Sequence, residues 1–374
     1  MYKILVMGMA VEVGGIERVI KNYYDNFDSD KVHLDFICAF PDNMAFENEF
    51  KKNGSKIFHV ARRGKNFFKY YKQLKNIFLN YGKEYDCLWF NTSDLANIDA
   101  LKLARKVGIK RVIIHSHNSR MTDQGMKGLL KTKLHFLHRA HAQNLGTDYW
   151  ACSEAAREWM FPPKLKEKVV LIKNAIDINH NAFNNEKRKE LKERLNLTNQ
   201  LVIGNVGRLN VQKNQIFLLK VFKKIKEDNS NITLVLVGEG PDRLRIEEET
   251  KKLGLDGKVM IVGQQKDMQA WYSLFDVFVF PSIFEGLSVA LLEAQSNGLP
   301  IVTSDRVSPE EVRINSNFKV LSLGQNISTW KSTIEKSIKT KRAEENTIVK
   351  NFNEHGYNIV TEAKVLEDNF INDK

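Results

Sequence analysis

Two glutamates in one short segment suggest a site that binds hydroxyl groups. The segment FPSIFEGLSVALLEAQSNGLPIVTSD covers residues 280–305 and places Glu285 and Glu293 eight residues apart. Its pattern predicts a strand, then a loop that holds Glu285, then a helix that holds Glu293. Because two helical turns take about 7.2 residues, both carboxylates can project from the same end of this unit. A carboxylate can accept hydrogen bonds from both hydroxyls of a diol.

The turn into this helix has the composition of an anion site. A glycine lets the backbone approach a ligand closely, and the first N–H groups of a helix attract phosphates. The residues at this turn are Gly286, Leu287 and Ser288. A plainer interpretation also exists, since a glutamate usually lies on a solvated helix face and strand–glycine–helix turns are common in α/β proteins.

A second segment supplies positive charge. VGRLNVQKNQ (206–215) predicts a buried strand that ends at Gly207, with Arg208 and Lys213 in the connection that follows. Two fixed cations beyond the carboxyl end of a strand could hold a diphosphate and stabilise it as a leaving group. The alternative is a pair of ordinary surface cations.

Several glycine-containing turns are weaker signals. LVLVGEGPDR (234–243) ends a strand at Gly238, and Gln265 lies in the following loop, VGQQKD (262–267). Near the N-terminus, Gly14 and Gly15 separate a strand from a helix predicted to begin near Ile16. That arrangement could cradle phosphate, but it lacks the full G-x-G-x-x-G pattern.

Two histidines follow another predicted strand, in the tetrapeptide HSHN (115–118). If the strand continues, we expect His115 and His117 to point to opposite faces, one buried and the other, His117, towards a ligand. A metal site is the alternative. The sequence offers no carboxylate cluster or third ligand at useful spacing, so no metal is predicted.

Together these motifs resemble glycosyltransferase family 4, a retaining family with the GT-B fold. The resemblance is strongest over 201–305 and weaker over 1–150. It covers the E-x7-E signature and the GRL…K-N motif, with these residues where the family has them: Arg208, Lys213, Glu285, Gly286, Leu287, Glu293, Ala294, Gly298 and Pro300.

The resemblance implies a role for each candidate residue. Arg208 and Lys213 would stabilise the diphosphate, Glu285 would hold the donor hexose, and Glu293 would hold the ribose. His117 would orient the sugar. The remaining donor-binding positions that the resemblance implies are Gly14, Gly15, Gly207, Gly238, Gln265, Gly286, Leu287 and Ser288.

The implied reaction moves a hexosyl group from a UDP-sugar to an acceptor hydroxyl with retention, without a metal or other cofactor. Details of the first half are similar to capsular and exopolysaccharide enzymes, so the implied acceptor is a saccharide on a polyprenyl diphosphate. Three alternatives remain: a glycoside hydrolase using Glu285 and Glu293, an inactive nucleotide-sugar-binding protein, and a UDP-sugar 2-epimerase of the same fold.

The predicted elements fit two doubly wound α/β domains facing across a cleft. Nearly continuous apolar runs indicate parallel strands that are covered on both faces. We expect an acceptor-binding domain over 1–175, a nucleotide-sugar-binding domain over 176–355, and a C-terminal helix, 356–374, that returns to the first domain. The predicted strands are 3–8, 33–38, 56–60, 87–90, 111–116, 149–153, 169–173, 201–207, 232–238, 259–263, 277–281 and 300–304.

Composition restricts the setting. The three cysteines of this 374-residue chain lack the spacing of a disulfide framework, and no apolar run is long enough to span a membrane, so a cytoplasmic protein is expected. Residues 1–175 hold 29 Lys+Arg and 18 Asp+Glu, which is +11 of the total +12. Two lysine- and aromatic-rich stretches, 65–85 and 127–143, are either ordinary packed helices or a surface for the inner face of an anionic membrane. Nucleic acid is not expected, since no recognised motif for it occurs.

Overall fold

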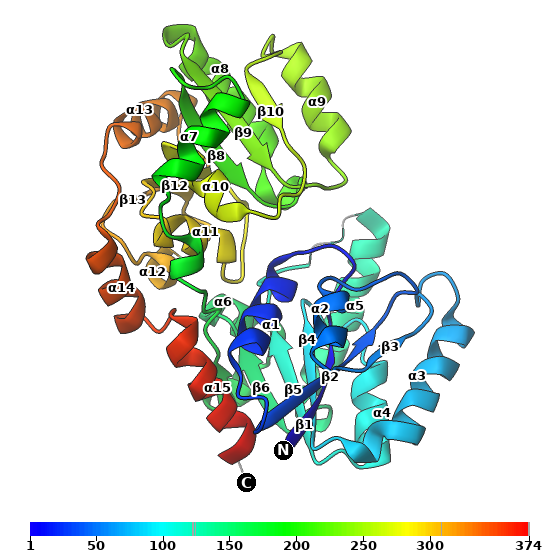
Figure 1. Ribbon diagram of the computed structural model, residues 1–374. Coiled ribbons are helices and arrows are strands. Elements are labelled where there is room, and N and C mark those ends of the chain that lie inside the picture. The colour runs from blue at the N-terminus through cyan, green and yellow to red at the C-terminus, as the bar shows by residue number, and fades with distance from the viewer. Residues whose placement is uncertain (122, 124, 308, 373–374) are drawn as a thin grey trace. The chain divides into compact units, whose positions relative to one another are not determined.

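The computed structural model describes residues 1–121, 123, 125–307 and 309–372. Two compact units divide the chain: one contains Met1–Ala175 together with the C-terminal segment from Ile359, and the other contains Ile176–Asn358. Each unit is an α/β layer structure around a parallel sheet, which confirms the predicted fold class (Figure 1).

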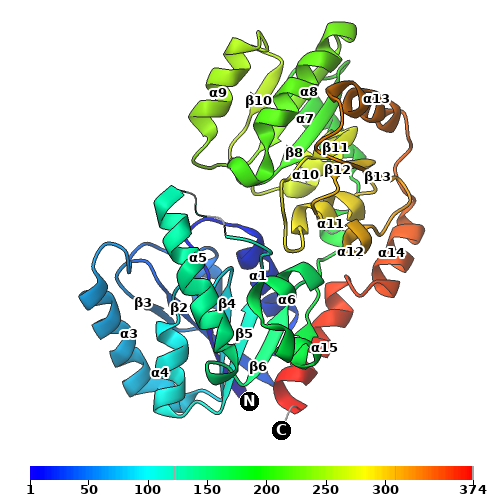
Figure 2. The same cartoon turned by 180° about the vertical axis from the view of Figure 1, so that it is seen from behind.

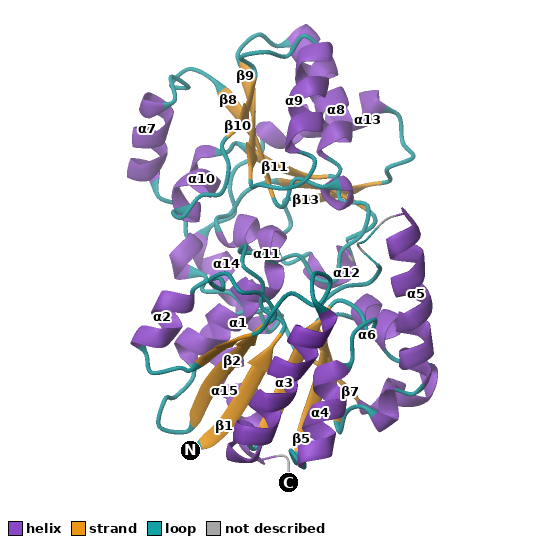
Figure 3. Ribbon diagram, turned by 90° about the vertical axis from the view of Figure 1, so that its right-hand side faces the viewer, coloured by secondary structure: helices purple, strands orange, loops and turns teal. Residues whose placement is uncertain are grey.

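The first unit has a seven-stranded sheet in the order β3-β2-β1-β4-β5-β6-β7, with all pairings parallel. Its strands are β1 (Tyr2–Met7), β2 (Val32–Cys38), β3 (Ile57–His59), β4 (Cys87–Thr92), β5 (Arg111–Ser116), β6 (Asp148–Ala151) and β7 (Val169–Leu171). Its helices are α1 (Gly15–Asn26), α2 (Glu47–Lys52), α3 (Phe67–Tyr81), α4 (Asp99–Val107), α5 (Gly125–Ala140), α6 (Glu154–Met160) and α15 (Ile359–Asn372). Helices α3, α4 and α5 lie on one side of the sheet, and α1 and α15 on the other (Figures 1 and 3).

Helix α15 packs on the first unit, although it ends the chain. Its apolar face is buried through Ile359, Ala363, Leu366 and Phe370. The Arg111 guanidinium on β5 donates hydrogen bonds to the carbonyls of its last turn, at 2.5 and 3.0 Å. A cation at a helix C-terminus complements the helix dipole.

The second unit has a six-stranded sheet in the order β10-β9-β8-β11-β12-β13, again parallel. Its strands are β8 (Leu201–Val206), β9 (Ile232–Val237), β10 (Val259–Ile261), β11 (Val277–Phe280), β12 (Ile301–Ser304) and β13 (Phe318–Leu321). Its helices are α7 (Asn185–Arg194), α8 (Gln215–Asp228), α9 (Arg243–Lys252), α10 (Met268–Leu274), α11 (Val289–Ser296), α12 (Pro309–Val312), α13 (Ile327–Ile338) and α14 (Glu345–Glu354). Helices α8, α9 and α13 cover one side of the sheet, and α7, α10 and α11 the other (Figure 3).

Helices cover both faces of the sheet, which explains why these strands are continuous apolar runs in the sequence. The core around β8 and β9 buries Leu218, Phe222 and Ile225 of α8 against Leu234 and other strand residues. Gly204 in β8 has a packing role, since a Cβ there would lie 2.1 Å from the Phe275 ring. Small and large residues on neighbouring elements are thus matched in the sheet centre.

Strand β13 was not predicted. It is a four-residue edge strand, and two of its residues, Lys319 and Val320, are exposed. Such a segment has neither a continuous apolar run nor a regular alternation, so its pattern is that of a loop.

Candidate functional site

In the sheet of the second unit, the order of successive strands reverses at β8, which lies between β9 and β11. In doubly wound sheets, ligands bind beyond the carboxyl ends of the strands at this switch point. The loop after β8 holds Gly207, Arg208 and Lys213, and the loop after β11 holds Glu285. Two motifs that are distant in the sequence therefore meet at the place where this fold binds ligands.

Lys213 and Glu285 form an ion pair across these two loops. The Lys213 Nζ donates to Glu285 Oε1 at 2.7 Å, and the exposed fractions of the two side chains are 15% and 8%. The ammonium also lies 4.7 Å from the centre of the Phe280 ring. Low exposure weakens the screening of the pair by water, so each charge depends strongly on its partner.

Local geometry holds the lysine in this position. The Asn210 side chain accepts a hydrogen bond from the Lys213 backbone N–H at 3.1 Å, and Asn214 adopts a left-handed conformation with φ 58°. Gly207 leaves room for the lysine stem, since a Cβ there would lie 3.1 Å from Lys213 Cε. The loop after β8 is thus shaped around this side chain.

Hydrogen bonds to backbone carbonyls join the two loops. The Ile283 N–H donates to the Gln212 carbonyl at 2.8 Å, and the Gln212 side chain donates to the Phe284 carbonyl at 3.0 Å. The Asn214 amide donates to the Pro281 carbonyl at 3.2 Å. These bonds fix the distance between the lysine loop and the glutamate loop without using either charged side chain.

Glu293 lies on α11 and has a different partner. Its carboxylate is buried and accepts a hydrogen bond from the Tyr272 hydroxyl of α10 at 2.7 Å. Gly286, Leu287 and Ser288 form the buried turn before α11, and Ser288 is its N-cap residue. The helix start and both glutamates therefore belong to one buried segment.

Arg208 differs from Lys213 because its side chain is exposed. Its carbonyl accepts a hydrogen bond from the Gln215 amide at 3.2 Å. The next turn packs closely behind it: Gly238 has φ 140°, and a Cβ there would lie 2.1 Å from the Gly207 carbonyl oxygen. Gly238 is therefore required for the close approach of the two strand ends.

Gln265 is held in the loop after β10. Its amide nitrogen donates to the Val262 carbonyl at 2.6 Å, and its oxygen accepts from the Trp271 indole at 3.2 Å. Trp271 and Tyr272 are neighbours on α10, so this helix contacts both Gln265 and Glu293.

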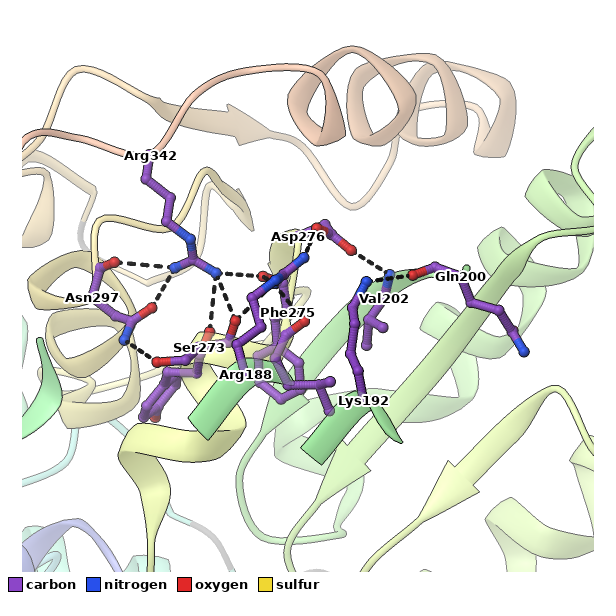
Figure 4. Close-up of polar contacts among 11 residues, drawn as sticks. Arg188, Lys192, Gln200, Val202, Ser273, Phe275, Asp276, Asn297 and Arg342 are labelled. Atoms are coloured by element: carbon purple, nitrogen blue, oxygen red, sulfur yellow. Dashed lines mark hydrogen bonds and ion pairs between the residues drawn. The ribbon is translucent and has the colours of Figure 1, made fainter. Parts of the chain in front are cut away.

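Two arginines fix the end of α10, as Figure 4 shows. Arg342 donates to the carbonyls of Ser273 and Phe275 at 3.1 and 2.5 Å and to that of Asn297 at 3.1 Å. Arg188 donates to the Ser273 and Phe275 carbonyls and to Asp276 Oδ1 at 2.6 Å. Burial lowers the pKa of Arg342 to about 9. Because Asn297 directly follows α11, Arg342 connects the helix that carries Tyr272 to the helix that carries Glu293.

Sequence reasoning missed Tyr272 and Arg342. Tyr272 looks like one more apolar residue in a buried helix, and Arg342 lies in the charged stretch KTKRAEE. Nothing in their local spacing marks them, since their contacts are with residues far along the chain.

In the first unit, the prediction that His115 and His117 point to opposite faces is wrong. Their ring centres are 4.1 Å apart. Residues i and i+2 of a strand share a face, so two histidines at this spacing lie on the same side of β5 and its extension. His115 is completely buried and its Nδ1 accepts from the Trp89 indole at 3.1 Å.

His117 has a polar partner on the neighbouring strand. Its Nε2 lies 2.8 Å from the Asn91 side-chain oxygen on β4, so Nε2 is the donor. Burial lowers the pKa of His117 to about 3, and burial followed by the nearness of the His117 ring lowers the pKa of His115. Both rings are therefore neutral at physiological pH. Asn91 was not singled out by the sequence.

Gly14 and Gly15 lie where β1 leads into α1. The Glu17 carboxylate folds back on this loop and accepts the N–H groups of Ala10 and Gly14 at 2.8 and 2.9 Å. An acidic side chain thus caps the start of α1. A Cβ at Gly15 would meet no atom within 4 Å.

Within the described parts of the chain, no group of three or more His, Cys, Asp or Glu side chains could hold a metal ion. The same parts contain no helix that is long and apolar enough to cross a membrane.

Known proteins resemble this chain over both units. The family model "Glycosyl transferases group 1" matches residues 186–355. EpsF of Bacillus subtilis, named as a glycosyltransferase, is 32% identical over 349 residues, which cover 92% of this chain and 90% of EpsF. An Escherichia coli protein named UDP-Gal:alpha-D-GlcNAc-diphosphoundecaprenol alpha-1,3-galactosyltransferase is 35% identical over 144 residues, 37% of each chain.

A solved structure shows the same fold. Alr3699/HepE of Anabaena, crystallised in complex with UDP and glucose, matches with a TM-score of 0.78 and 18% identity over 99% of both chains. The fold places the chain among doubly wound α/β proteins, in which ligands bind where the strand order reverses. The chain belongs to the group 1 glycosyltransferases (family 4) and has the GT-B fold, which confirms the resemblance inferred from its motifs.

Proposed function

We propose that this glycosyltransferase moves a hexosyl group from a UDP-sugar to a saccharide on a polyprenyl diphosphate, with retention of configuration, during assembly of a surface polysaccharide. The Lys213–Glu285 pair carries the proposal. It holds a cation and a carboxylate 2.7 Å apart at the switch point of the sheet, where a sugar diphosphate needs one of each.

In the proposed reaction the bond between the hexose and the diphosphate breaks and negative charge develops on the leaving oxygen. Lys213, Arg208 and the first N–H groups of α11 stabilise that charge. The acceptor hydroxyl attacks on the face from which the diphosphate leaves, and its proton passes to the departing oxygen. No side chain becomes covalently attached to the sugar.

The two glutamates have separate tasks in this proposal. Glu285 accepts hydrogen bonds from the donor hexose, and Glu293, oriented by Tyr272, accepts them from the ribose hydroxyls. Gly207, Gly238 and Gln265 shape the nucleotide side of the site. In the first unit, Gly14, Gly15 and His117 contribute to binding of the donor sugar.

Named relatives support the choice of donor and acceptor. The Escherichia coli relative is named for UDP-Gal and a diphosphoundecaprenol-linked GlcNAc, and the Anabaena structure contains UDP. A basic first half would favour a diphosphate-linked acceptor, since residues 1–175 hold 29 Lys+Arg against 18 Asp+Glu.

A thermal-shift panel of UDP-, GDP- and ADP-hexoses tests the donor. A ligand at 100 times its Kd stabilises the folded state by about 2.7 kcal/mol. We expect UDP-hexoses to raise the melting temperature and the GDP and ADP analogues to leave it unchanged. Lys213→Ala should reduce the shift only slightly, and Lys220→Ala, on the exposed part of α8, serves as the matched control.

Product analysis distinguishes the remaining activities. With a lipid-diphosphate saccharide and the stabilising donor, we expect a new glycosidic bond of retained configuration and release of UDP. Isomerisation of the donor without transfer would instead indicate an epimerase, binding without turnover an inactive protein, and cleavage of a glycoside without any response to UDP a hydrolase. Each of these three results would overturn the proposal.

A further inference from the structure

Helix α5 turns its large apolar side chains outward. The exposed fractions are 90% for Met126, 64% for Leu129, 62% for Leu130 and 59% for Leu137. Their spacing of three, four and seven residues places them in one stripe along the helix. The helix lies on the outside of the first unit (Figure 2). An amphipathic helix of a globular protein normally buries such a stripe.

The opposite side of α5 is attached to the protein by polar groups. Among the residues of α5, all of which are described, the buried ones are Gly128 and His135. His135 Nδ1 accepts the Leu95 N–H at 3.0 Å, and its ring stacks on Trp159 at 4.1 Å between centres. Gly128 permits close contact, since a Cβ there would lie 2.1 Å from the Asp123 carbonyl oxygen. These contacts fix the direction in which the apolar stripe points.

Helix α3 shows the usual arrangement and serves as a comparison. It was the other basic, aromatic-rich stretch, yet it buries Tyr70, Leu74 and Phe78 at four-residue spacing. This apolar stripe therefore packs on the first unit, although Phe68 and Leu79 outside it are 84% and 55% exposed. The difference between the two helices is visible only from burial, because both sequences combine lysines with apolar residues.

The charge of α5 matches an anionic surface. Residues 125–140 contain four cations and no Asp or Glu. Two of them turn towards the protein: Lys131 pairs with Asp123, and Arg139 donates to the carbonyls of Glu158 and Phe161 at 2.9 and 2.7 Å. The other two flank the apolar stripe: Lys127, which pairs with Asp123 at 2.8 Å and is 72% exposed, and the exposed Lys133. Apolar side chains flanked by cations are the composition of helices that lie in the interface of an anionic bilayer.

We propose that α5 is a membrane-contacting helix, which inserts Met126, Leu129, Leu130 and Leu137 into the interface of an anionic lipid bilayer while Lys127 and Lys133 contact the headgroups. This inference deepens the proposed function, since a polyprenyl-linked acceptor resides in such a bilayer. An apolar stripe of this size needs a partner, and the surrounding cations select an anionic lipid surface over a neutral one.

Vesicle flotation with the full-length chain tests the proposal. Phosphatidylcholine vesicles with and without phosphatidylglycerol are compared for the parent protein, for the double variant Leu129→Gln/Leu130→Gln and for Leu244→Gln. Leu244 is a leucine on α9 of the second unit with 73% exposure, which makes it the matched control. All three substitutions replace exposed residues, and circular dichroism confirms that each variant is folded.

The parent protein and Leu244→Gln are expected to bind the anionic vesicles, and the double variant to bind at least about tenfold more weakly. Equal binding by the double variant, or no binding by the parent protein, would overturn the proposal. The proposal would also be overturned if the parent protein were a dimer and the double variant a monomer, because the stripe would then contact a second copy of this chain.

Activity on a short-chain, water-soluble acceptor keeps the two proposals separate. The double variant should transfer sugar to this acceptor at the parent rate but lose activity on acceptor embedded in vesicles. If the parent protein floats with vesicles but transfers to neither acceptor, the proposed function fails while the membrane contact stands.

Discussion

Removing the Lys213 charge should have separate effects on stability and on catalysis. At 2.7 Å and an effective dielectric constant of about 20, the attraction between the two charges is about 6 kcal/mol before desolvation is subtracted. Breaking a buried pair by deleting one partner costs about 3–5 kcal/mol, because the other charge stays buried. Lys213 is 15% exposed and Glu285 8%, so we expect Lys213→Met to destabilise by about 3 kcal/mol, the lower end of that range.

The double variant Lys213→Met/Glu285→Gln isolates the pair. It leaves no buried charge uncompensated, so most of the lost stability should return. By calorimetry, Lys213→Met should melt about 6–12 °C below the parent protein and the double variant within a few degrees of it. Lys220→Met should melt like the parent protein, because the residue is exposed on α8.

Catalysis should not recover with stability. If Lys213 stabilises the departing diphosphate, both variants should lose about 10²–10³ in kcat. The donor Kd should change much less for Lys213→Met, which is the variant used for this comparison because the double variant also lacks the Glu285 carboxylate. A double variant no more stable than Lys213→Met would refute the buried pair. Equal losses in kcat and donor affinity would show that the lysine only binds the donor.

Two further predictions concern the neighbouring polar groups. Tyr272→Phe removes the hydrogen bond to the Glu293 carboxylate, which is worth about 1.5–3 kcal/mol for a charged acceptor. Steady-state kinetics should show the donor KM raised by about 10- to 100-fold with little change in kcat. Tyr357→Phe, which loses a hydrogen bond to a neutral carbonyl, is the control. The lowered pKa values of His115 and His117 mean that below pH 6.5 the unfolded chain takes up protons that the folded chain does not, so stability should fall as the pH falls, by about 1.4 kcal/mol per histidine at pH 5.5. His135, whose pKa burial lowers to about 4, contributes a third decline of the same size. Melting curves between pH 7.5 and 5.5 should therefore show about two thirds of the histidine-dependent decline for His117→Gln, and an unchanged slope would contradict the assignment.

Most of the architecture followed from local patterns, because parallel strands that are covered on both faces are continuous apolar runs. The runs at 201–207 and 277–281 became β8 and β11, shifted by a residue at most. The edge strand β13 was not predicted because two of its four residues are exposed, which breaks the apolar run. The error on the two histidines has a different origin. Residues i and i+2 of a strand lie on the same face, so the spacing of His115 and His117 predicts one shared face and not two opposite ones.

The residues of the site were easier to predict than the contacts between them. Lys213 and Glu285 are 72 residues apart, and Tyr272 and Glu293 are 21 apart. A motif marks a residue at the end of a strand, but it does not say which other strand end lies beside it. Arg342 is the extreme case, since its hydrogen-bond partners in the described part of the chain lie at least 45 residues away.

Strand order supplies the missing information. Ile203 and Gly204 of β8 pair with Val277 and Phe278 of β11, so the carboxyl ends of these two strands are neighbours. Any side chain in the loop after one strand is then within reach of the loop after the other. If β9 instead separated β8 from β11, the same two motifs would lie about 9–10 Å apart across two strand spacings, too far for a lysine and a glutamate to pair at hydrogen-bond distance without extending both side chains. The site is therefore a consequence of the doubly wound order β9-β8-β11, and the two motifs acquire a joint chemistry only in that order.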